Sequence, residues 1–338
     1  MKVKRQNVGI DVSKDSLASC LVFLTEDFDI KIKSSKKFQN NADGFSELFS
    51  WANSKKDSNL EITFTMEPTG VYYEGVAYYL FEKKQAVHVV LPNRAKKYAD
   101  SLQDKAKTDK LDAKALGRLG VERRLNKWHV DSPVYRNLKI LTRERNALIK
   151  ERTVFQNQLH ALNHSAYPFK KSVTRLKQMI RFINKQIKTI EKDCENIVNK
   201  DETVKAKVDK VTTIPGIGFI TAIVVIAETN GFALITSIKQ LVSYAGLDIR
   251  IRESGKWKGK SKITKKGNVQ IRKALYFPSY TSVKYSETNA KFYERLFERK
   301  GKSMVAATAV QRKLLGLIYT LWKNDTTYVE NYQQNKAA

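Results

Sequence analysis

Cysteine, histidine and long apolar runs are all scarce in this sequence. Its 338 residues include two cysteines, Cys20 and Cys194, and four histidines. Two isolated cysteines cannot build a disulfide framework, and a structural zinc site normally takes four ligands. The longest apolar run, residues 219–227, is far shorter than the ~20 residues that a bilayer-spanning helix needs. The sequence therefore predicts neither a disulfide scaffold nor a zinc module, and no helix that crosses a membrane.

The start of the chain has little of a secretory signal. It begins with basic residues and then enters a strand-like stretch that contains Asp11, without a continuous apolar core or a small-residue cleavage site. We therefore expect a cytoplasmic protein.

Acidic residues are few compared with basic ones. Only 34 Asp and Glu residues oppose 62 Lys and Arg residues, which gives a formal net charge of +28 and a pI near 9.9. A charge imbalance of this size indicates a polyanionic partner, and nucleic acid is the first candidate. The hydrophobic content of 42% is enough to fill the core of a globular protein.

Alternating apolar residues in the first part of the chain, 1–125, predict a mixed sheet covered by helices. The pattern predicts two strands around a turn within 8–24 and a third strand over 28–33. The elements expected after these are a helix over 42–53, a strand over 61–66, a helix over 72–83, a strand over 87–91, and helices over 94–102 and 111–123. This order is typical of a ribonuclease-H-like fold.

The middle region, 126–205, is predicted to be a helical coiled coil. It has no glycine from 134 to 200, and Pro168 separates two long helical patterns. Apolar residues of the second helix step by four and three, as in a heptad seam: Leu176, Ile180, Ile183, Ile187, Ile190, Cys194 and Ile197. The two helices could pair within one chain or join two copies of it.

The last region, 206–330, is predicted to be mainly helical. A glycine-bearing turn over 213–218 precedes an apolar helix over 219–228, and such a turn can present backbone N–H groups to a phosphate. Further helices are expected around 238–245, from 269 and from 304, with a basic loop before residue 269. The whole chain is thus expected to be α/β followed by α.

Four carboxylates occupy positions that suit metal-dependent chemistry: Asp11, Glu67, Asp109 and Asp112. The first two end predicted strands, and the last two share one face of a predicted helix. Phosphodiester chemistry often uses two divalent ions ~4 Å apart, and Mg²⁺ prefers oxygen ligands, so several carboxylates must converge. The alternative is that the helical pair only caps or flanks a helix N-terminus and that the others terminate strands.

Lysines are dense over 250–268, with one tryptophan among them. The candidate nucleic-acid contacts are Arg252, Lys256, Trp257, Lys258, Lys260, Lys262, Lys265 and Lys266. Their cations can neutralise backbone phosphates, and the tryptophan can stack on an unpaired base. Ser254 precedes Gly255, which allows a close backbone approach, so its hydroxyl could reach a scissile phosphate. The alternative is a solvated flexible loop with an ordinary serine.

Together these motifs resemble the DEDD transposases of the IS110 insertion-sequence family. The motifs are Gly9-Ile10-Asp11, Glu67-Pro68-Thr69-Gly70, Thr108-Asp109-Lys110-Leu111-Asp112-Ala113, Ile214-Pro215-Gly216-Ile217-Gly218, Tyr244-Ala245-Gly246-Leu247, Glu253-Ser254-Gly255 and Lys265-Lys266-Gly267-Asn268. The resemblance extends from Gly9 to about Lys323. One departure is Asp248-Ile249, where the family often has a proline after its Gly-Leu pair.

The resemblance implies a RuvC-like N-terminal domain whose DEDD tetrad falls on Asp11, Glu67, Asp109 and Asp112. It also implies a C-terminal transposase domain with Ser254 as nucleophile, a covalent phosphoserine intermediate, and Mg²⁺ or Mn²⁺ as cofactor. Donor and target double-stranded DNA, a non-coding guide RNA and a homodimer or tetramer are the implied partners.

The function expected from the sequence is therefore that of a transposase or site-specific DNA recombinase, which cuts and rejoins DNA. Two alternatives remain open at this stage. One is a structure-specific nuclease in which metal-activated water attacks and the serine is a loop residue. The other is a non-catalytic nucleic-acid-binding protein whose acidic groups are helix caps.

Overall fold

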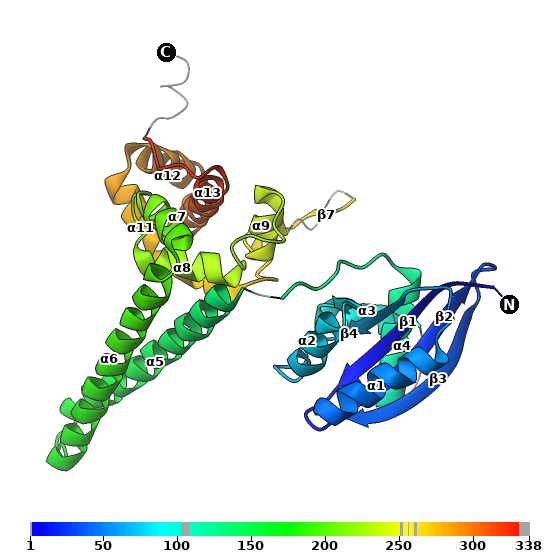
Figure 1. The fold of residues 1–338 in the computed structure, drawn as a ribbon. Helices are drawn as coiled ribbons and strands as arrows, with labels where there is room; N and C mark the ends of the chain where they lie inside the picture. Colours follow the sequence, from blue (N-terminus) through cyan, green and yellow to red (C-terminus); the bar gives the residue numbers. More distant parts are fainter. Residues whose placement is uncertain are drawn as a thin grey trace. The chain divides into compact units, whose positions relative to one another are not determined.

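A computed structural model describes residues 2–102, 108–130, 132–250, 253–255, 257–259 and 262–330, with the backbone alone at 257 and 258. The chain divides into two compact units, Met1–Val130 and Asp131–Ala338, and each is described by itself (Figure 1). Among the residues covered by these ranges, no helix combines the length and apolar character needed to cross a membrane.

The first unit is built on a five-stranded mixed sheet with the order β3-β2-β1-β4-β5. Its strands are β1 (Val3–Val12), β2 (Ser16–Thr25), β3 (Ile30–Gln39), β4 (Ile62–Met66) and β5 (Ala86–Val89). The first three strands are antiparallel neighbours, whereas β4 runs parallel to β1 and β5 runs parallel to β4. This topology confirms the ribonuclease-H-like mixed sheet predicted from the alternating pattern.

Helices cover both faces of this sheet. They are α1 (Ala42–Lys55), α2 (Glu74–Glu82), α3 (Pro92–Ser101) and α4 (Asp109–Glu122). One face, with Val8 and Ile10, packs against α1 and α2, and the other, with Cys20 and Val22, packs against α4. The central strand β1 is therefore buried on both sides, which explains its nearly continuous run of buried residues.

The second unit begins with two long helices, α5 (Pro133–Asn163) and α6 (Lys170–Asn199), on either side of Pro168. They pack against each other within the chain, so the intramolecular interpretation of the seam is the one observed. Ile183, Ile187, Ile190 and Cys194 are buried in α6, as the heptad pattern predicted. An Arg145–Glu191 ion pair with an N–O distance of 2.7 Å also joins the two helices.

The remaining helices of the second unit pack together around one shared core. They are α7 (Glu202–Thr212), α8 (Phe219–Glu228), α9 (Ile238–Tyr244), α10 (Val269–Ala274), α11 (Tyr276–Tyr285), α12 (Glu287–Lys300) and α13 (Ser303–Asn324). Ile223, Val225 and Ile226 of α8 are fully buried, in one core with residues of α5, α6 and α13. The predicted phosphate-binding turn before α8 packs against α11. The contact is close, since a Cβ on Gly216 would lie 2.7 Å from the Pro278 carbonyl oxygen.

The segment predicted as a basic loop contains two short antiparallel strand pairs between α9 and α10. Strand β6 (Ile249–Arg250) pairs with β9 (Lys262–Ile263), and β7 (Glu253–Ser254) pairs with β8 (Trp257–Lys258). Isoleucines face each other across the first pair, and Gly255 turns the chain in the second with a φ of +55°. We call residues 249–263 the serine arm.

Candidate active site

Asp11 and Glu67 occupy adjacent positions at the carboxyl ends of two parallel strands. Residues of β1 and β4 pair as Asn7 with Thr63 and as Gly9 with Thr65, so the next residues on that face are the two carboxylates. The Asn7 amide fixes this register, because its Nδ2 donates to the hydroxyls of Thr63 and Thr65 at 2.6 and 2.9 Å. Both carboxylates are partly buried.

Helix α4 covers the same face and runs opposite to β1. A Cβ on Gly120 would lie 2.3 Å from the Asn7 side chain, and a Cβ on Gly9 would lie 2.1 Å from the Ala113 carbonyl oxygen. Asp11 lies two residues after Gly9 in β1. Because α4 runs opposite to β1, the first turn of α4 lies toward the same end of the sheet as Asp11. The fold therefore brings Asp109 and Asp112 to the end of the sheet that carries the other two carboxylates.

The cap of α4 is Thr108, whose hydroxyl accepts from the Leu111 amide at 3.3 Å. Asp109 and Asp112 follow in the first turn, where negative charge is favoured by the helix dipole. Thr108 is therefore the capping residue, and the two aspartates flank the helix start, as the alternative interpretation also allowed.

The chemistry of this donor set suits a hard divalent cation, since all its ligands would be carboxylate oxygens. Within the part of the chain that the structure describes, however, no three His, Cys, Asp or Glu side chains converge on one ion position. Asp109 instead pairs with Lys37, with 3.5 Å between its Oδ2 and the lysine Nζ. The structure thus places the four carboxylates at one end of the sheet without bringing them into a closed cluster.

A cavity of about 530 Å³ opens beside Asp109. It is lined by Ala18, Ser19, Ser35, Lys36, Lys37, Thr108, Asp109 and Lys110. Three lysines next to the carboxylate end of the sheet provide an environment for an anionic group such as a phosphate. Our sequence reasoning missed these lysines. The adjacent Lys36-Lys37 pair near the end of a strand was the available signal.

Ser254 lies on the serine arm, in the second unit. It is exposed and pairs through its backbone with residue 257 across the Gly255 turn. A Cβ on Gly255 would meet no atom of the described residues within 4 Å.

The predicted nucleic-acid contacts are only partly within the described residues. Lys262, Lys265 and Lys266 are exposed at or just after β9. Trp257 and Lys258 form β8, of which only the backbone is described. The predicted contacts Arg252, Lys256 and Lys260 lie outside the described residues.

The root of the serine arm is held by hydrogen bonds between segments on its two sides. The Lys265 amide donates to the Gly246 carbonyl at 3.1 Å, and the Asn268 amide donates to the Tyr244 carbonyl at 2.7 Å. Arg272 adds a bridge, since its Nη1 donates to the carbonyls of Ala245 and Gly267 at 2.8 and 3.1 Å. The arm therefore extends from a fixed base.

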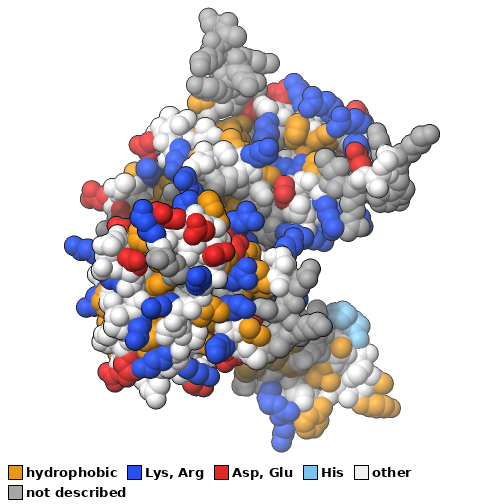
Figure 2. Space-filling model, turned by 90° about the vertical axis from the view of Figure 1, so that its right-hand side faces the viewer, with side chains coloured by type: hydrophobic (Ala, Val, Ile, Leu, Met, Phe, Trp, Pro, Cys, Tyr) orange, Lys and Arg blue, Asp and Glu red, His pale blue; other side chains and the backbone are white. Residues whose placement is uncertain are grey.

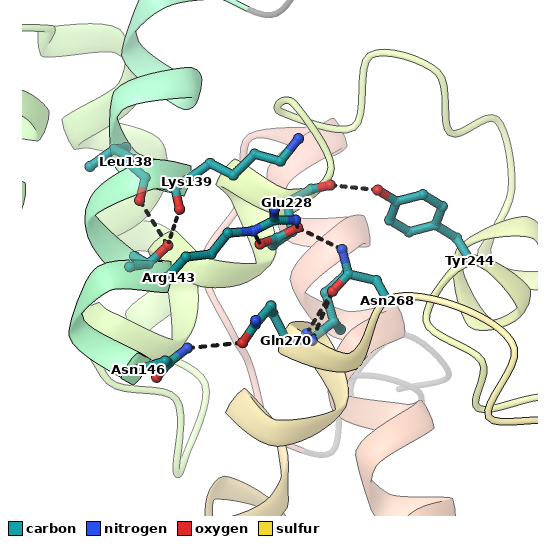
Figure 3. Close-up of polar contacts among 10 residues, drawn as sticks. Leu138, Lys139, Arg143, Asn146, Glu228, Tyr244, Asn268 and Gln270 are labelled. Atoms are coloured by element: carbon teal, nitrogen blue, oxygen red, sulfur yellow. Dashed lines mark hydrogen bonds and ion pairs between the residues drawn. The ribbon is translucent and has the colours of Figure 1, made fainter. Parts of the chain in front are cut away.

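A buried carboxylate, Glu228, lies behind this base (Figure 3). Arg143 of α5 donates to it through Nε at 2.7 Å and through Nη2 at 2.9 Å. This hydrogen bonding to the carboxylate raises the pKa of Arg143 above its usual value. Asn268 Nδ2 donates at 2.6 Å to Glu228 Oε2, the oxygen that also accepts from Arg143 Nη2. Our sequence reasoning missed this cluster. Its only local signal was a glutamate at the end of an otherwise apolar helix.

Positive charge is widespread on the surface. Figure 2 shows Lys and Arg side chains at many places on the face in view, among groups of Asp and Glu and of hydrophobic side chains. The positive charge on this face is thus not confined to one loop. Such a distribution suits a ligand with extended negative charge.

Comparison with known proteins agrees with these features. A family model for transposases of the DEDD IS110 type matches residues 8–168, and a model described as transposase IS116/IS110/IS902 family matches residues 208–294. The first range contains all four carboxylates and the second contains Ser254.

Relatives match along most of the chain. Pilin gene-inverting proteins of Moraxella lacunata and Moraxella bovis are 30% and 29% identical to it, with 95% of this chain and 97% of each relative covered. A transposase for insertion sequence element IS1111A from Coxiella burnetii is 23% identical, with 71% of this chain and 72% of the relative covered. A solved structure of T. thermophilus RuvC in complex with Holliday junction substrate covers 34% of this chain and 96% of its own, at 12% identity and a TM-score of 0.26.

The family matches define a DNA-processing enzyme of the transposase and recombinase class. Within that class, the chain belongs to the IS116/IS110/IS902 family of transposases.

Proposed function

We propose that this protein is a DNA recombinase of an insertion sequence that cuts and rejoins DNA through a covalent bond to Ser254. The observation that carries this proposal is an exposed serine at the tip of a hairpin with a fixed base, in a chain whose other unit presents four carboxylates at one end of its sheet. The names of the Moraxella relatives describe inversion of a gene, which is a rearrangement that breaks and rejoins strands.

In the proposed step, the Ser254 Oγ attacks the phosphorus of a DNA phosphodiester. An O–P bond to serine forms and the bond from phosphorus to one deoxyribose oxygen breaks, while the serine proton leaves and the released oxygen takes up a proton. A hydroxyl of another strand then reverses the reaction and frees the serine. Since one ester replaces another, no high-energy cofactor is consumed.

Asp11, Glu67, Asp109 and Asp112 are the residues that would hold Mg²⁺ or Mn²⁺. The ion would supply positive charge that polarises the phosphate and offsets the charge developing on it. Lys37 and Lys110 line the cavity beside these carboxylates and would bind flanking phosphates. Lys262, Lys265 and Lys266 would have the same role next to Ser254, as would Arg252, Lys256, Lys258 and Lys260 of the basic stretch. Trp257 would stack on an unpaired base.

The partners we propose are donor and target double-stranded DNA, a non-coding guide RNA of the same element, and further copies of the chain in a dimer or tetramer. The proposal of a guide RNA and of this assembly rests on the family resemblance. The high positive charge supports binding to either nucleic acid.

The decisive experiment is capture of the covalent intermediate. Purified protein is incubated with Mg²⁺, the RNA that flanks the element, and labelled DNA that carries the element junction, and a denaturing gel is used to detect a protein–DNA adduct. We expect an adduct with the natural chain and none with Ser254→Ala, while DNA binding by the variant stays within about twofold because only a hydroxyl is lost.

Matched carboxylate variants complete this test. Asp11→Asn should also abolish the adduct, whereas Asp15→Asn, a change at an exposed residue in the turn between β1 and β2, should leave it unchanged. Metal-dependent nicks without an adduct would support the nuclease alternative. DNA binding with neither nicks nor an adduct would support the non-catalytic alternative.

A further inference from the structure

We propose that Glu228 positions the serine arm, through Asn268, and that Arg143 holds Glu228 in place for this role. The proposal deepens the function proposed above and rests on Ser254 being the nucleophile. It concerns positioning residues, because none of the three is placed against DNA.

Glu228 is a carboxylate whose side chain has no exposed surface. Removing a charged group from water is costly unless it is paired and hydrogen-bonded, and a well-packed apolar residue is often as stable. Here both oxygens are satisfied, one by Arg143 Nε and the other by Arg143 Nη2 and Asn268 Nδ2. A buried ion pair often adds no stability compared with apolar residues of similar size. The presence of this pair therefore suggests a role other than stability.

Asn268 forms hydrogen bonds through both polar groups of its side chain and through its backbone amide. Its Oδ1 caps α10 by accepting from the amides of Gln270 and Ile271 at 2.9 and 3.2 Å, and its Nδ2 donates to Glu228. Its backbone amide donates to the Tyr244 carbonyl, at the other side of the arm's root. Tyr244 in turn donates its hydroxyl to the Glu228 carbonyl oxygen at 2.8 Å. Residues on both sides of the serine arm are therefore tied to Glu228, Tyr244 through the backbone carbonyl oxygen of Glu228 and Asn268 through the Glu228 carboxylate (Figure 3).

These hydrogen bonds hold the two segments at the root of the arm, 244–246 and 265–268, in close contact with each other. A Cβ on Gly267 would lie 2.3 Å from the Tyr244 carbonyl oxygen and 2.6 Å from the Gly246 nitrogen. At Gly255 a Cβ would meet no atom of the described residues within 4 Å. Only three residues separate Ser254 from Arg250 in the chain, so we expect the direction of the root to limit where the serine can lie.

Arg143 connects this base to the long helix α5. Its guanidinium makes a fork-like pair with Glu228, which fixes the carboxylate in two directions. Glu228 thus links α5, through Arg143, with the start of α10, through Asn268. We expect this link to orient the arm relative to the helices of its unit.

The test is Asn268→Asp, a change of one atom type that keeps the helix cap. Aspartate caps as well as asparagine, but it places a second carboxylate at the 2.6 Å contact with Glu228. Two carboxylates that close cannot both be charged without strain, so one binds a proton as the pH falls. The defect should therefore be largest near pH 8 and should fade toward pH 5.5.

Two readouts are measured, each relative to the natural chain at the same pH. The first is the rate of adduct formation at saturating junction DNA, and the second is amide hydrogen exchange of the serine arm compared with α13. At pH 8 we expect adduct formation to fall at least about tenfold, as expected for a displaced reacting group, with DNA affinity unchanged. Exchange should accelerate in the arm but not in α13, and both effects should diminish at pH 5.5.

The matched control is Asn146→Ala. Asn146 Nδ2 donates to Gln270 Oε1 at 3.1 Å, so this variant also removes a hydrogen bond between α5 and α10 but leaves Glu228 untouched. It should behave like the natural chain in both readouts.

The proposal is overturned if Asn268→Asp forms the adduct at the natural rate with unchanged exchange of the arm at pH 8. It is also overturned if exchange accelerates equally in α13, because the cluster would then serve general stability. If the natural chain itself forms no adduct, the proposed function fails. Amide hydrogen exchange of the serine arm in Asn268→Asp then decides alone whether Glu228 holds the arm in place.

Discussion

Small residues at one contact decide whether the carboxylates can lie at the same end of the sheet. Gly9 on β1 faces Ala113 and Gly117 on α4, and a Cβ on Gly9 would lie 2.1 Å from backbone atoms of both. Backbone atoms cannot move aside as a flexible side chain can. The helix that carries Asp109 and Asp112 therefore depends on glycine at this position of the strand.

We predict that Gly9→Ala destabilises the protein by roughly 1–3 kcal/mol or more, because α4 must move away from β1. The measurement is urea unfolding followed by circular dichroism, together with the adduct assay, in which the variant should also be impaired. Gly316→Ala is the control, since its Cβ would make ordinary contact with Ile238 at 3.4 Å. In the middle of α13, alanine should be neutral or stabilising by up to about 1 kcal/mol. Equal stability of Gly9→Ala and the natural chain would show that α4 is not held as the structure indicates.

At the scale of elements, the seam between the two long helices sets the chemistry of a cysteine. Burial raises the pKa of the Cys194 thiol to about 11, and burial also raises the pKa of Cys20 in β2. A thiol reacts as its thiolate, whose fraction at pH 8 is very small when the pKa lies about three units higher.

We therefore predict that neither cysteine reacts with a thiol reagent such as dithionitrobenzoate at pH 8 in the folded protein. Both should react after unfolding in guanidinium chloride, where burial no longer raises the pKa. In the folded protein, reaction should become faster as the pH rises toward 11, since the thiolate fraction increases. Rapid labelling of Cys194 at pH 8 would mean that the seam is open.

Elements with strong local signals could be predicted from the sequence. The long helices followed from a glycine-free stretch interrupted by Pro168, and the mixed sheet followed from alternating apolar residues. The strand pairs of the serine arm were missed because two-residue strands leave almost no pattern.

The candidate site was predictable only where its residues lie in recognisable motifs. The four carboxylates and the serine could be proposed from their spacing and from the family resemblance. The Glu228 cluster could not, because its partners Arg143 and Asn268 are 85 and 40 residues away in the chain. The pairing of Lys37 with Asp109 was hidden for the same reason, since only the folded sheet brings β3 to the start of α4.

At the scale of the whole molecule, charge is the dominant feature. A net charge of +28 over 338 residues means that counterion release should contribute strongly to nucleic-acid binding. Binding should then be far more sensitive to salt than an interaction based on apolar contacts.

We predict that the affinity for junction DNA falls by about 10³–10⁵ between 50 and 200 mM salt, as for proteins with 6–10 phosphate contacts. Fluorescence anisotropy at several salt concentrations gives the slope of log K against log salt. Lys266→Ala should make this slope shallower by about one if the lysine contacts a phosphate. Lys188→Ala, on an exposed position of α6, serves as a comparison for loss of charge alone. An affinity that hardly changes with salt would contradict a binding mode based on backbone phosphates.

The buried pair of Arg143 and Glu228 also restricts how the protein can evolve. Losing either residue alone leaves an unpaired charge, whereas replacing both with apolar residues of similar size can preserve stability. A lineage would therefore have to pass through a damaged intermediate to reach the apolar pair. Descendants of this gene should therefore keep both residues, since the apolar pair would also lose the contact with Asn268.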